Sequence, residues 1–354
     1  MSRFFSQKYA ALTPYTPGEQ PRNRQYIKLN TNESPFPPSP KAQEYARQAA
    51  GELQLYSDPT CAALTAKAAE VFGIDPEEII FTNGSDDVLN FAFMAFCDEN
   101  HPARFPDITY GFYSVFAELN RVPYTQVPLK DDLTVNVQDY VNCDSTVFLA
   151  NPNAPTGMAL TLDEIETIVK SNPHNVVVID EAYVDFGAES AVSLIRKYDN
   201  LLVTQTFSKS RSLAGGRLGM GMGSKALIRD LNTLRFSTNP YNINRMTMAA
   251  GLGALEDEAY FRQNCDTIME NRTWTTAELE KLGFTVLPSM TNFVFAKNPA
   301  IAGKALYQAL KDRGILVRHF HTPRLTDFVR VTVGSEEQMA AFIQTTKEIL
   351  EVTP

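Results

Sequence analysis

Residues 201–219 read Leu-Leu-Val-Thr-Gln-Thr-Phe-Ser-Lys-Ser-Arg-Ser-Leu-Ala-Gly-Gly-Arg-Leu-Gly and join an apolar run to a glycine-rich turn. The apolar part predicts a buried strand. Upstream, four β-branched residues at 176–179 end in Asp180 and predict another. Open α/β sheets bind their ligands at the carboxyl ends of the strands, so we expect the Asp180 carboxylate at a ligand-binding edge.

An amine, a guanidinium and two hydroxyls lie within this segment. Lys209 can form a Schiff base with an aldehyde, and Thr206 and Ser208 supply hydroxyl donors beside it. Arg217 offers a planar fork that matches phosphate oxygens, and the glycines around it let the backbone approach a ligand closely. Together these groups match an aldehyde that carries a phosphate, such as pyridoxal 5'-phosphate (PLP).

Two more side chains complete the set that PLP needs. The carboxylate of Asp180 would keep the pyridine nitrogen protonated, because a buried carboxylate favours the charged form of its partner. Tyr183, three residues later, supplies a phenol for the O3' oxygen of the ring. Lys209, Asp180 and Tyr183 are therefore the predicted catalytic residues, and each is also predicted to bind the cofactor.

Each of these features has a simpler explanation when taken alone. Asp180 could only end a strand, and Lys209 could be a solvated surface lysine. A Ser-Lys hydrolase dyad is disfavoured because no recognisable oxyanion hole lies nearby. No G-x-G-x-x-G fits residues 215–223, and G-x-x-x-x-G-K-[ST] occurs nowhere, which argues against dinucleotide and P-loop sites. The order and spacing of the whole set favour PLP.

Helical and strand patterns alternate through the first two thirds of the chain. This alternation predicts an α/β fold with a mainly parallel sheet covered by helices on both faces. Residues 1–40 hold seven of the 21 prolines and are expected to form an extended arm. A large domain is predicted at 41–250, and a small α+β domain at 251–354. Strands are predicted at 77–82, 104–109, 124–129, 145–150, 176–180, 201–206, 285–287, 292–296, 315–318 and 328–333.

The turn Asn83-Gly84-Ser85 separates a predicted strand from a helical pattern at 86–97. First-turn amides and the helix macrodipole would point at this turn and make it a potential anion site, with Ser85 as the helix cap. The simpler explanation is a capped helix with acidic residues in its first turn.

Charge and hydropathy argue against two classes of partner. The net charge of −9 and a pI near 5.1, with no run of basic residues, disfavour general nucleic-acid binding. The longest apolar stretch, Phe91 to Cys97, is too short to span a bilayer. No secretory signal is visible in residues 1–15. We expect small-molecule substrates, no nucleic acid and no membrane.

Cysteine and histidine patterns predict the compartment and the absence of a metal site. The cysteines show no C-x-x-C spacing and are expected to be buried thiols in a reducing cytoplasm. His319 and His321 could pair on a strand face, but no acidic or thiol partner lies close by, so no metal is expected. The four cysteines are Cys61, Cys97, Cys143 and Cys265.

Nearly the whole chain resembles the fold-type I PLP-dependent aminotransferases, and most closely their histidinol-phosphate branch. Related aromatic aminotransferases and phosphothreonine decarboxylases carry similar motifs, so the resemblance specifies the superfamily more closely than the substrate. It implies a seven-stranded sheet in the large domain. The motifs are Leu29-Asn30-Thr31-Asn32-Glu33, Tyr56-Ser57-Asp58-Pro59, Asn83-Gly84-Ser85-Asp86, Thr109-Tyr110-Gly111-Phe112-Tyr113, Asn151-Pro152-Asn153-Ala154-Pro155-Thr156-Gly157, Asp180-Glu181-Ala182-Tyr183, the Lys209 segment and Val329-Arg330-Val331-Thr332-Val333-Gly334.

The resemblance implies further cofactor-binding residues. It places the PLP phosphate against Gly84, Ser85 and Asp86, and the ring of Tyr110 on the PLP ring, although a core tyrosine is the alternative for the latter. It also implies a homodimer with shared active sites, in which Tyr56 reaches the phosphate of the neighbouring subunit.

Two arginines are candidates for the substrate's anion. Arg330 lies mid-strand between valines, where an arginine is costly unless it has an anionic partner. Arg318 repeats the pattern one strand earlier. The resemblance adds Asn32 as a substrate-binding residue and Tyr15 as the arm tyrosine that closes over the substrate's phosphate.

One position departs from the family pattern. Most relatives have an asparagine before Pro-Thr-Gly that hydrogen-bonds O3' of PLP, and here that position is Ala154. Asn153 could substitute through a local shift, or Tyr183 could hold O3' alone. Asn153 is accordingly included among the predicted cofactor-binding residues.

The resemblance implies the activity of a histidinol-phosphate:2-oxoglutarate aminotransferase of histidine biosynthesis, which we expect to be cytoplasmic. Lys209 would hold PLP as a Schiff base and, once displaced by the donor amine, would act as the general base. The alternatives are an aromatic amino-acid aminotransferase on the same scaffold, a phosphothreonine decarboxylase and a non-catalytic PLP-binding module. No helix-turn-helix segment accompanies the last of these.

Overall fold

The centre of the larger unit is a seven-stranded sheet. The computed structural model describes residues 2–15, 18–21 and 24–352. The strand order is β2-β8-β7-β6-β5-β3-β4, and all neighbours are parallel except β8, which is antiparallel to both β2 and β7. The predicted fold class is confirmed. The strands are β2 (Ile79–Thr82), β3 (Ala103–Pro106), β4 (Tyr124–Val127), β5 (Thr146–Ala150), β6 (Val177–Asp180), β7 (Leu201–Thr206) and β8 (Gly219–Gly223).

Strand β8 was not among the strands predicted from the residue pattern. Its sequence, Gly-Met-Gly-Met-Gly, has the two-residue alternation of a strand. Glycine weakens strands, however, so the residue pattern did not indicate one here. Packing explains the glycines: a Cβ on Gly219 would lie 2.1 Å from the backbone nitrogen of Ser85. Gly219 thus lets the turn before α3 sit directly against the sheet.

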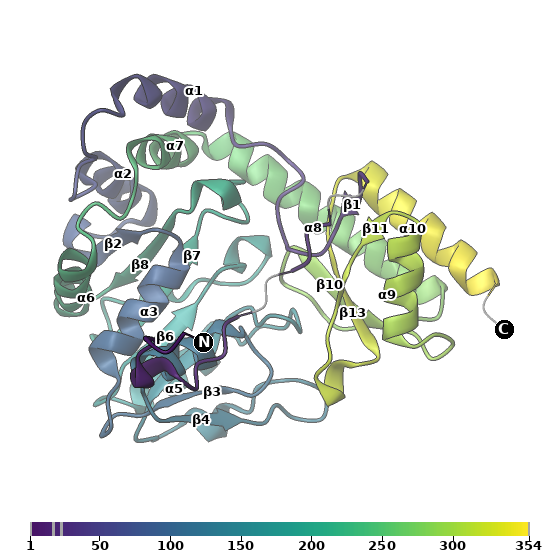
Figure 1. The fold of residues 1–354 in the computed structure, drawn as a ribbon, viewed down its shortest axis with the longest axis horizontal. Helices are drawn as coiled ribbons and strands as arrows, with labels where there is room; N and C mark the ends of the chain where they lie inside the picture. Colours follow the sequence, from purple (N-terminus) through teal and green to yellow (C-terminus); the bar gives the residue numbers. More distant parts are fainter. Residues whose placement is uncertain (1, 16–17, 22–23, 353–354) are drawn as a thin grey trace.

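Helices cover both faces of this sheet (Figure 1). Val178 and Leu202 share one apolar cluster with α3, α4 and α6, whereas Val177 and Leu201 belong to a cluster with α1, α2, α5 and α7. Successive side chains of a strand point to opposite faces of the sheet, which is why adjacent residues belong to different clusters. The helices are α1 (Pro40–Ala49), α2 (Ala62–Phe72), α3 (Ser85–Phe96), α4 (Phe112–Asn120), α5 (Leu162–Ser171), α6 (Lys225–Thr238) and α7 (Arg245–Glu256).

A second unit contains a four-stranded antiparallel sheet of order β12-β13-β10-β9. The long helix α8 runs from the larger unit into it (Figure 1). Strand β1, from the N-terminal arm, pairs in parallel with β11, so the arm is tied to this unit. The elements are β1 (Ile27–Lys28), α8 (Glu258–Lys281), β9 (Thr285–Val286), β10 (Phe293–Lys297), α9 (Gly303–Asp312), β11 (Ile315–Leu316), β12 (Arg318–His319), β13 (Phe328–Thr332) and α10 (Glu336–Glu351).

Two local expectations need adjustment. Ser85 is the first residue of α3 rather than its cap, which is Gly84. The predicted strand at 315–318 is divided between β11 and β12. Residue 250, the predicted limit of the large domain, lies inside α7, where Ala250 and Ala254 pack in the core of the larger unit. The domain limits stay a prediction. Among the described helices, none combines the length and apolar character needed to cross a membrane.

Candidate active site

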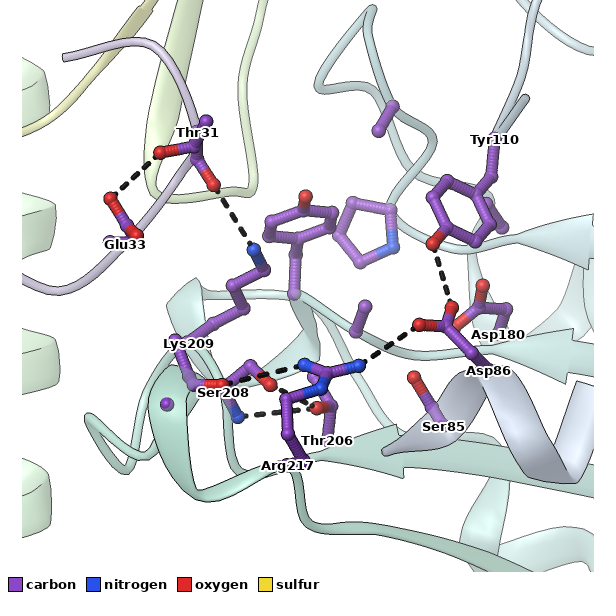
Figure 2. A pocket seen from close by; sticks show the side chains of 17 residues that line it. Thr31, Glu33, Ser85, Asp86, Tyr110, Asp180, Thr206, Ser208, Lys209 and Arg217 are labelled. Carbon is purple, nitrogen blue, oxygen red and sulfur yellow. Dashed lines mark hydrogen bonds and ion pairs between the residues drawn. The ribbon is translucent and has the colours of Figure 1, made fainter. Parts of the chain in front are cut away.

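A cavity of about 330 Å³ lies at the carboxyl ends of β6 and β7 (Figure 2). The structure brings most of the predicted cofactor-binding residues to its wall. Those that line it are Ser85, Asp86, Tyr110, Asp180, Tyr183, Thr206, Ser208, Lys209 and Arg217.

Lys209 projects into this cavity from the loop after β7 (Figure 2). Its Nζ donates to the backbone oxygen of Thr31, on the N-terminal arm, at 3.3 Å. It also lies 5.8 Å from the centre of the Tyr183 ring. Among the described residues the amine has one hydrogen-bond partner, and it is positioned to react with a carbonyl carbon in the cavity.

Asp180 ends β6 with its carboxylate almost fully buried, at 4% exposure. Tyr113 donates to Oδ2 at 3.0 Å, and Thr204 donates to Oδ1 at 3.2 Å. Burial raises the pKa of Asp180 to about 6, helped by the negative charge of Asp86 and opposed by the two hydrogen bonds. A buried carboxylate of this kind is stabilised by a cationic partner such as a protonated ring nitrogen.

Glu181 faces away from this cavity, as alternation along the chain requires. Its carboxylate accepts from the backbone N–H of Ala191, from Ser190 Oγ at 2.6 Å and from Gln205 Nε2 at 2.8 Å. Burial raises the pKa of Glu181 to about 7. Its contacts join the end of β6 to the following loop, so of the two consecutive acids only Asp180 lines the cavity.

Another part of the cavity wall combines a guanidinium with a helix N-terminus. Arg217 Nη2 lies 3.1 Å from Asp86 Oδ2, and Tyr110 donates to Asp86 Oδ1 at 2.7 Å (Figure 2). Gly84, at φ +85°, lets the guanidinium approach, because a Cβ there would be 2.7 Å from Nη2. Ser85 opens α3, whose first-turn amides and macrodipole favour an anion at this place.

A smaller cavity of about 220 Å³ adjoins the first. It is lined by all four predicted substrate-binding residues, namely Tyr15, Asn32, Arg318 and Arg330. The two cavities share lining residues, which makes them compartments of one site. The shared residues are Thr31, Tyr110, Ala154, Tyr183 and Lys209.

Arg318 and Arg330 are direct register partners on β12 and β13, so two guanidinium groups come from neighbouring strand positions. Arg330 Nη2 donates to the backbone oxygen of Asn30 at 3.2 Å, whereas its Nε is buried without a partner. Neither arginine forms a salt bridge with another described residue. Burial lowers the pKa of Arg330. An unpaired donor beside a second cation points to an anionic ligand.

The N-terminal arm forms one wall of the smaller cavity. The ring of Tyr15 packs on Phe112 with a centroid distance of 4.3 Å. Its side chain is 41% exposed, so it lies at the rim of the cavity.

Three predicted site residues do not line either cavity. Gly84 is one of them, although it lies directly against the Arg217 guanidinium and precedes Ser85. The other two are Asn153 and Tyr56. The Asn153 side chain donates to Ile108 O and Thr156 Oγ1 and accepts from Thr109, so its polar atoms serve the fold. Tyr56 is 79% exposed and stacks on Tyr241 at 4.5 Å. Within one chain, Tyr56 lies outside the site.

Other residues at the site were not singled out from the sequence. Glu33 lines the larger cavity, accepts from Thr31 Oγ1 at 2.7 Å and pairs with Lys28. Tyr113 holds Asp180 and lies one helical turn after Tyr110. The three-residue spacing in Tyr110-Gly-Phe-Tyr113 could have indicated a shared face.

The residues present fit PLP. The cavity supplies an amine, a buried carboxylate of raised pKa and an arginine beside a helix N-terminus. The close approach of Gly84 to Arg217 shows a cradle that a side chain at 84 would fill. In the described part of the chain, no group of three or more His, Cys, Asp or Glu side chains could hold a metal ion.

We expect Asp180→Asn to stabilise the cofactor-free protein above pH 6 but not near pH 4. The carboxyl has a higher pKa when folded, about 6 against an ordinary value of 3.8, so the folded state favours its protonated form. Stability is therefore lost as the pH rises between these values, by about 2 to 3 kcal/mol. Thermal unfolding of both proteins across pH 4 to 8 measures this. An equal difference at all pH values would contradict it.

Comparisons with known proteins give a consistent result. A sequence model of the family described as "Aminotransferase class I and II" matches residues 24–345. The histidinol-phosphate aminotransferase of Brachyspira hyodysenteriae is 47% identical, over 99% of this chain and 100% of that protein. The histidinol-phosphate aminotransferase of a Marinomonas species is 49% identical, with 99% of this chain and 100% of that protein covered.

Solved structures share the fold. The crystal structure of histidinol-phosphate aminotransferase from Sinorhizobium meliloti in complex with pyridoxal-5'-phosphate has a TM-score of 0.90 at 23% identity, covering 99% of this chain and 98% of that one. The histidinol-phosphate aminotransferase from Clostridium acetobutylicum has a TM-score of 0.83 at 21% identity, covering 92% of this chain and 99% of that one. At these identities the two structures show the fold alone.

Proposed function

The chain belongs to the class I and II aminotransferases, and from this we propose that it is a histidinol-phosphate:2-oxoglutarate aminotransferase. It is a PLP-dependent transaminase. Relatives that are 47% and 49% identical over their full lengths bear the name histidinol-phosphate aminotransferase. The observation that carries the proposal is the pair of adjoining cavities with Lys209 in the wall of both.

The larger cavity is proposed to hold the cofactor. Arg217, Ser85 and the first turn of α3 would bind its phosphate, with the hydroxyls of Thr206 and Ser208 on the same side. Tyr110 would contact the ring, and Tyr183 its O3' oxygen. When bound, PLP serves as an electron sink for the electron pair left on the donor carbon.

Two residues are proposed to control protons at this site. Lys209 Nζ would take the proton from the donor carbon that bears the amine and return it in the reverse direction. Asp180 would hold a proton on the ring nitrogen, and its hydrogen bonds from Tyr113 and Thr204 fix both oxygens for that task.

The smaller cavity is proposed to bind the anionic end of the substrate. Histidinol phosphate has a phosphate and no α-carboxylate, so Arg318 and Arg330 would bind the phosphate of the donor and then the carboxylates of 2-oxoglutarate. Two guanidinium groups at facing strand positions suit a dianion. Tyr15 would cover this end from the arm.

An amino-donor panel tests the assignment. Initial rates with histidinol phosphate and with phenylalanine, each with 2-oxoglutarate, should favour histidinol phosphate by at least about a hundredfold in kcat/KM. A phosphate dianion can pair with both guanidinium groups, whereas the single carboxylate of phenylalanine leaves the second cation unpaired. Equal or higher rates with phenylalanine would instead identify an aromatic amino-acid aminotransferase.

Arg217→Ala and Arg330→Ala should have different effects, since they lie in different cavities. Arg217→Ala is expected to lose cofactor on dialysis. Arg330→Ala is expected to keep the cofactor absorbance while kcat/KM falls about 30- to several-thousand-fold for both half-reactions. Arg313→Ala, at an exposed arginine beyond α9, is the control and should change neither. Release of cofactor from Arg330→Ala with intact substrate affinity would contradict the model.

We further propose a cytoplasmic homodimer with shared active sites. Tyr56 is exposed beside Leu53 and Leu55, and its ring stacks on the partly exposed Tyr241. A neighbouring subunit would cover this apolar surface and receive Tyr56 at its phosphate site. Free cysteines, with no disulfide among them, fit a reducing compartment. Light scattering of the purified protein measures the subunit number.

A further inference from the structure

We propose that Asn32 is a positioning residue that directs the hydroxyl proton of Tyr183 into the active-site cavity, toward the cofactor's phenolic oxygen. This inference rests on the proposed function, because it assigns a partner to the tyrosine of that site. It also gives Asn32 a role different from the substrate contact expected from the sequence.

The orientation of the Asn32 amide follows from its bonds with Thr332. The backbone N–H of Asn32 donates to Thr332 Oγ1 at 3.0 Å, and a backbone nitrogen can only donate. The hydroxyl proton of Thr332 is therefore free to be donated to Asn32 Oδ1, 2.9 Å away. Because Oδ1 accepts, Nδ2 faces Tyr183 and donates to its phenolic oxygen at 2.9 Å.

This bond determines how Tyr183 uses its own proton. A phenolic oxygen that accepts from an amide keeps its O–H for another acceptor. The ring is held edge-on against Phe293, at a centroid distance of 5.3 Å and an angle of 89°. Since Tyr183 lines both cavities, the direction left for its O–H is into the site.

Asn32 is itself held rigidly. It is 1% exposed and has a left-handed backbone with φ 55°, a conformation in which asparagine is enriched. Its backbone oxygen accepts from Asn292 Nδ2 at 3.0 Å. Backbone nitrogen, backbone oxygen, Oδ1 and Nδ2 thus each have a protein partner, which suits a support for Tyr183 better than a group that must rearrange around substrate.

Ala154 and Asn153 supply no alternative hydrogen-bond donor, so the Tyr183 hydroxyl is the more important. Ala154 lines both cavities and contributes only a methyl group. The amide of Asn153 donates to Ile108 O and Thr156 Oγ1 instead. Neither residue supplies a donor that could replace Tyr183.

The test is a pH titration of the visible absorbance of the resting holoenzyme, without amino donor. A hydrogen bond to the phenolic oxygen stabilises negative charge there, so its loss makes the bound chromophore keep its proton to higher pH. Asn32→Ala should raise the midpoint by about 0.5 to 1 unit. Asn32→Asp should raise it further, close to Tyr183→Phe, because a carboxylate would accept the proton of Tyr183.

Three further variants test whether the shift in midpoint arises from the bond between Asn32 and Tyr183 rather than from added charge or from misfolding. Asn30→Asp is the charge control, because it adds the same negative charge to the wall of the smaller cavity. The Asn30 amide donates to the backbone oxygen of Glu19 and not to Tyr183, so this variant should shift the midpoint less than Asn32→Asp. In a Tyr183→Phe background, Asn32→Ala should add nothing. Thr332→Val removes the hydroxyl that orients Asn32 and should shift the midpoint in the same direction if the Asn32 variants fold poorly.

Two results would overturn the proposal. One is an equal shift from Asn32→Ala with and without the Tyr183 hydroxyl. The other is an unchanged midpoint with a raised KM, which would make Asn32 a substrate contact. The titration uses no donor, so an error in the donor's identity leaves its outcome intact, whereas absence of bound PLP would contradict the proposed function itself.

Discussion

Lys209→Ala is expected to lower turnover by at least about three orders of magnitude while the protein folds and still binds PLP. The variant lacks both the amine that attaches the cofactor and the base that moves the donor's proton. In the described part of the chain the Lys209 ammonium donates one hydrogen bond, to the Thr31 carbonyl, and lies over the Tyr183 ring, so truncation should cost little stability. Steady-state kinetics and cofactor absorbance after dialysis measure the two effects.

Chemical labelling identifies the lysine directly. Borohydride reduction of the holoenzyme, followed by peptide mapping, should place the cofactor on Lys209. Lys28 provides a matched control, since its ammonium pairs with Glu33 at the wall of the same cavity but points to that carboxylate. Lys28→Ala should retain the label at residue 209. A label on any other lysine would remove the basis of the assignment.

Asp180→Asn is expected to reduce activity by at least about two orders of magnitude. The amide keeps the shape of the carboxylate but cannot hold a proton on the ring nitrogen, and a charged pair in a dry site contributes several kcal/mol. The same substitution should stabilise the cofactor-free protein above pH 6, because the pKa of Asp180 is raised to about 6. Activity and stability should thus change in opposite directions.

Glu181→Gln is the matched control for this variant. Glu181 is equally buried and adjacent, but its carboxylate bonds to Ser190, Gln205 and the Ala191 amide rather than lining the cavity. It should spare the cofactor absorbance and reduce activity by less than about tenfold. Near-normal activity in Asp180→Asn would show that Asp180 only ends a strand.

Local residue patterns predicted most of the strands and helices of the larger unit. Apolar runs of four and three residues, at 176–179 and 201–203, predicted β6 and β7, and the strand ends located Asp180 and the Lys209 segment at one edge. Thr161 with Glu164, and Ser335 with Gln338, form capping boxes that begin α5 and α10, and each box lies within four consecutive residues. These features depend on neighbouring residues, so the chain carries their signal within a few positions.

Strand β8 and the direction of Asn153 could not be predicted in the same way. The glycines of β8 are explained by the close approach of the Ser85 backbone, a contact between segments more than 130 residues apart. Asn153 lies in a recognisable motif, but its amide turns to Ile108 and Thr156. Which way a side chain points depends on neighbours that the motif does not contain.

The sequence alone determined the α/β class through its alternating helix and strand patterns, and its motifs carried the resemblance that identified the family. It also predicted Lys209 and Asp180 as neighbours, because strand patterns and the residues at strand ends are short-range properties of the chain. Tertiary structure decided which distant groups share a site. It set Arg318 beside Arg330, and it joined Asn32 to Tyr183 across 151 positions and to Thr332 across 300. The arginine pair arises from the register of β12 with β13, and the Asn32 bonds arise where the arm meets β13 and the loop after β6. No local pattern encodes the direction of a hydrogen bond formed between such segments.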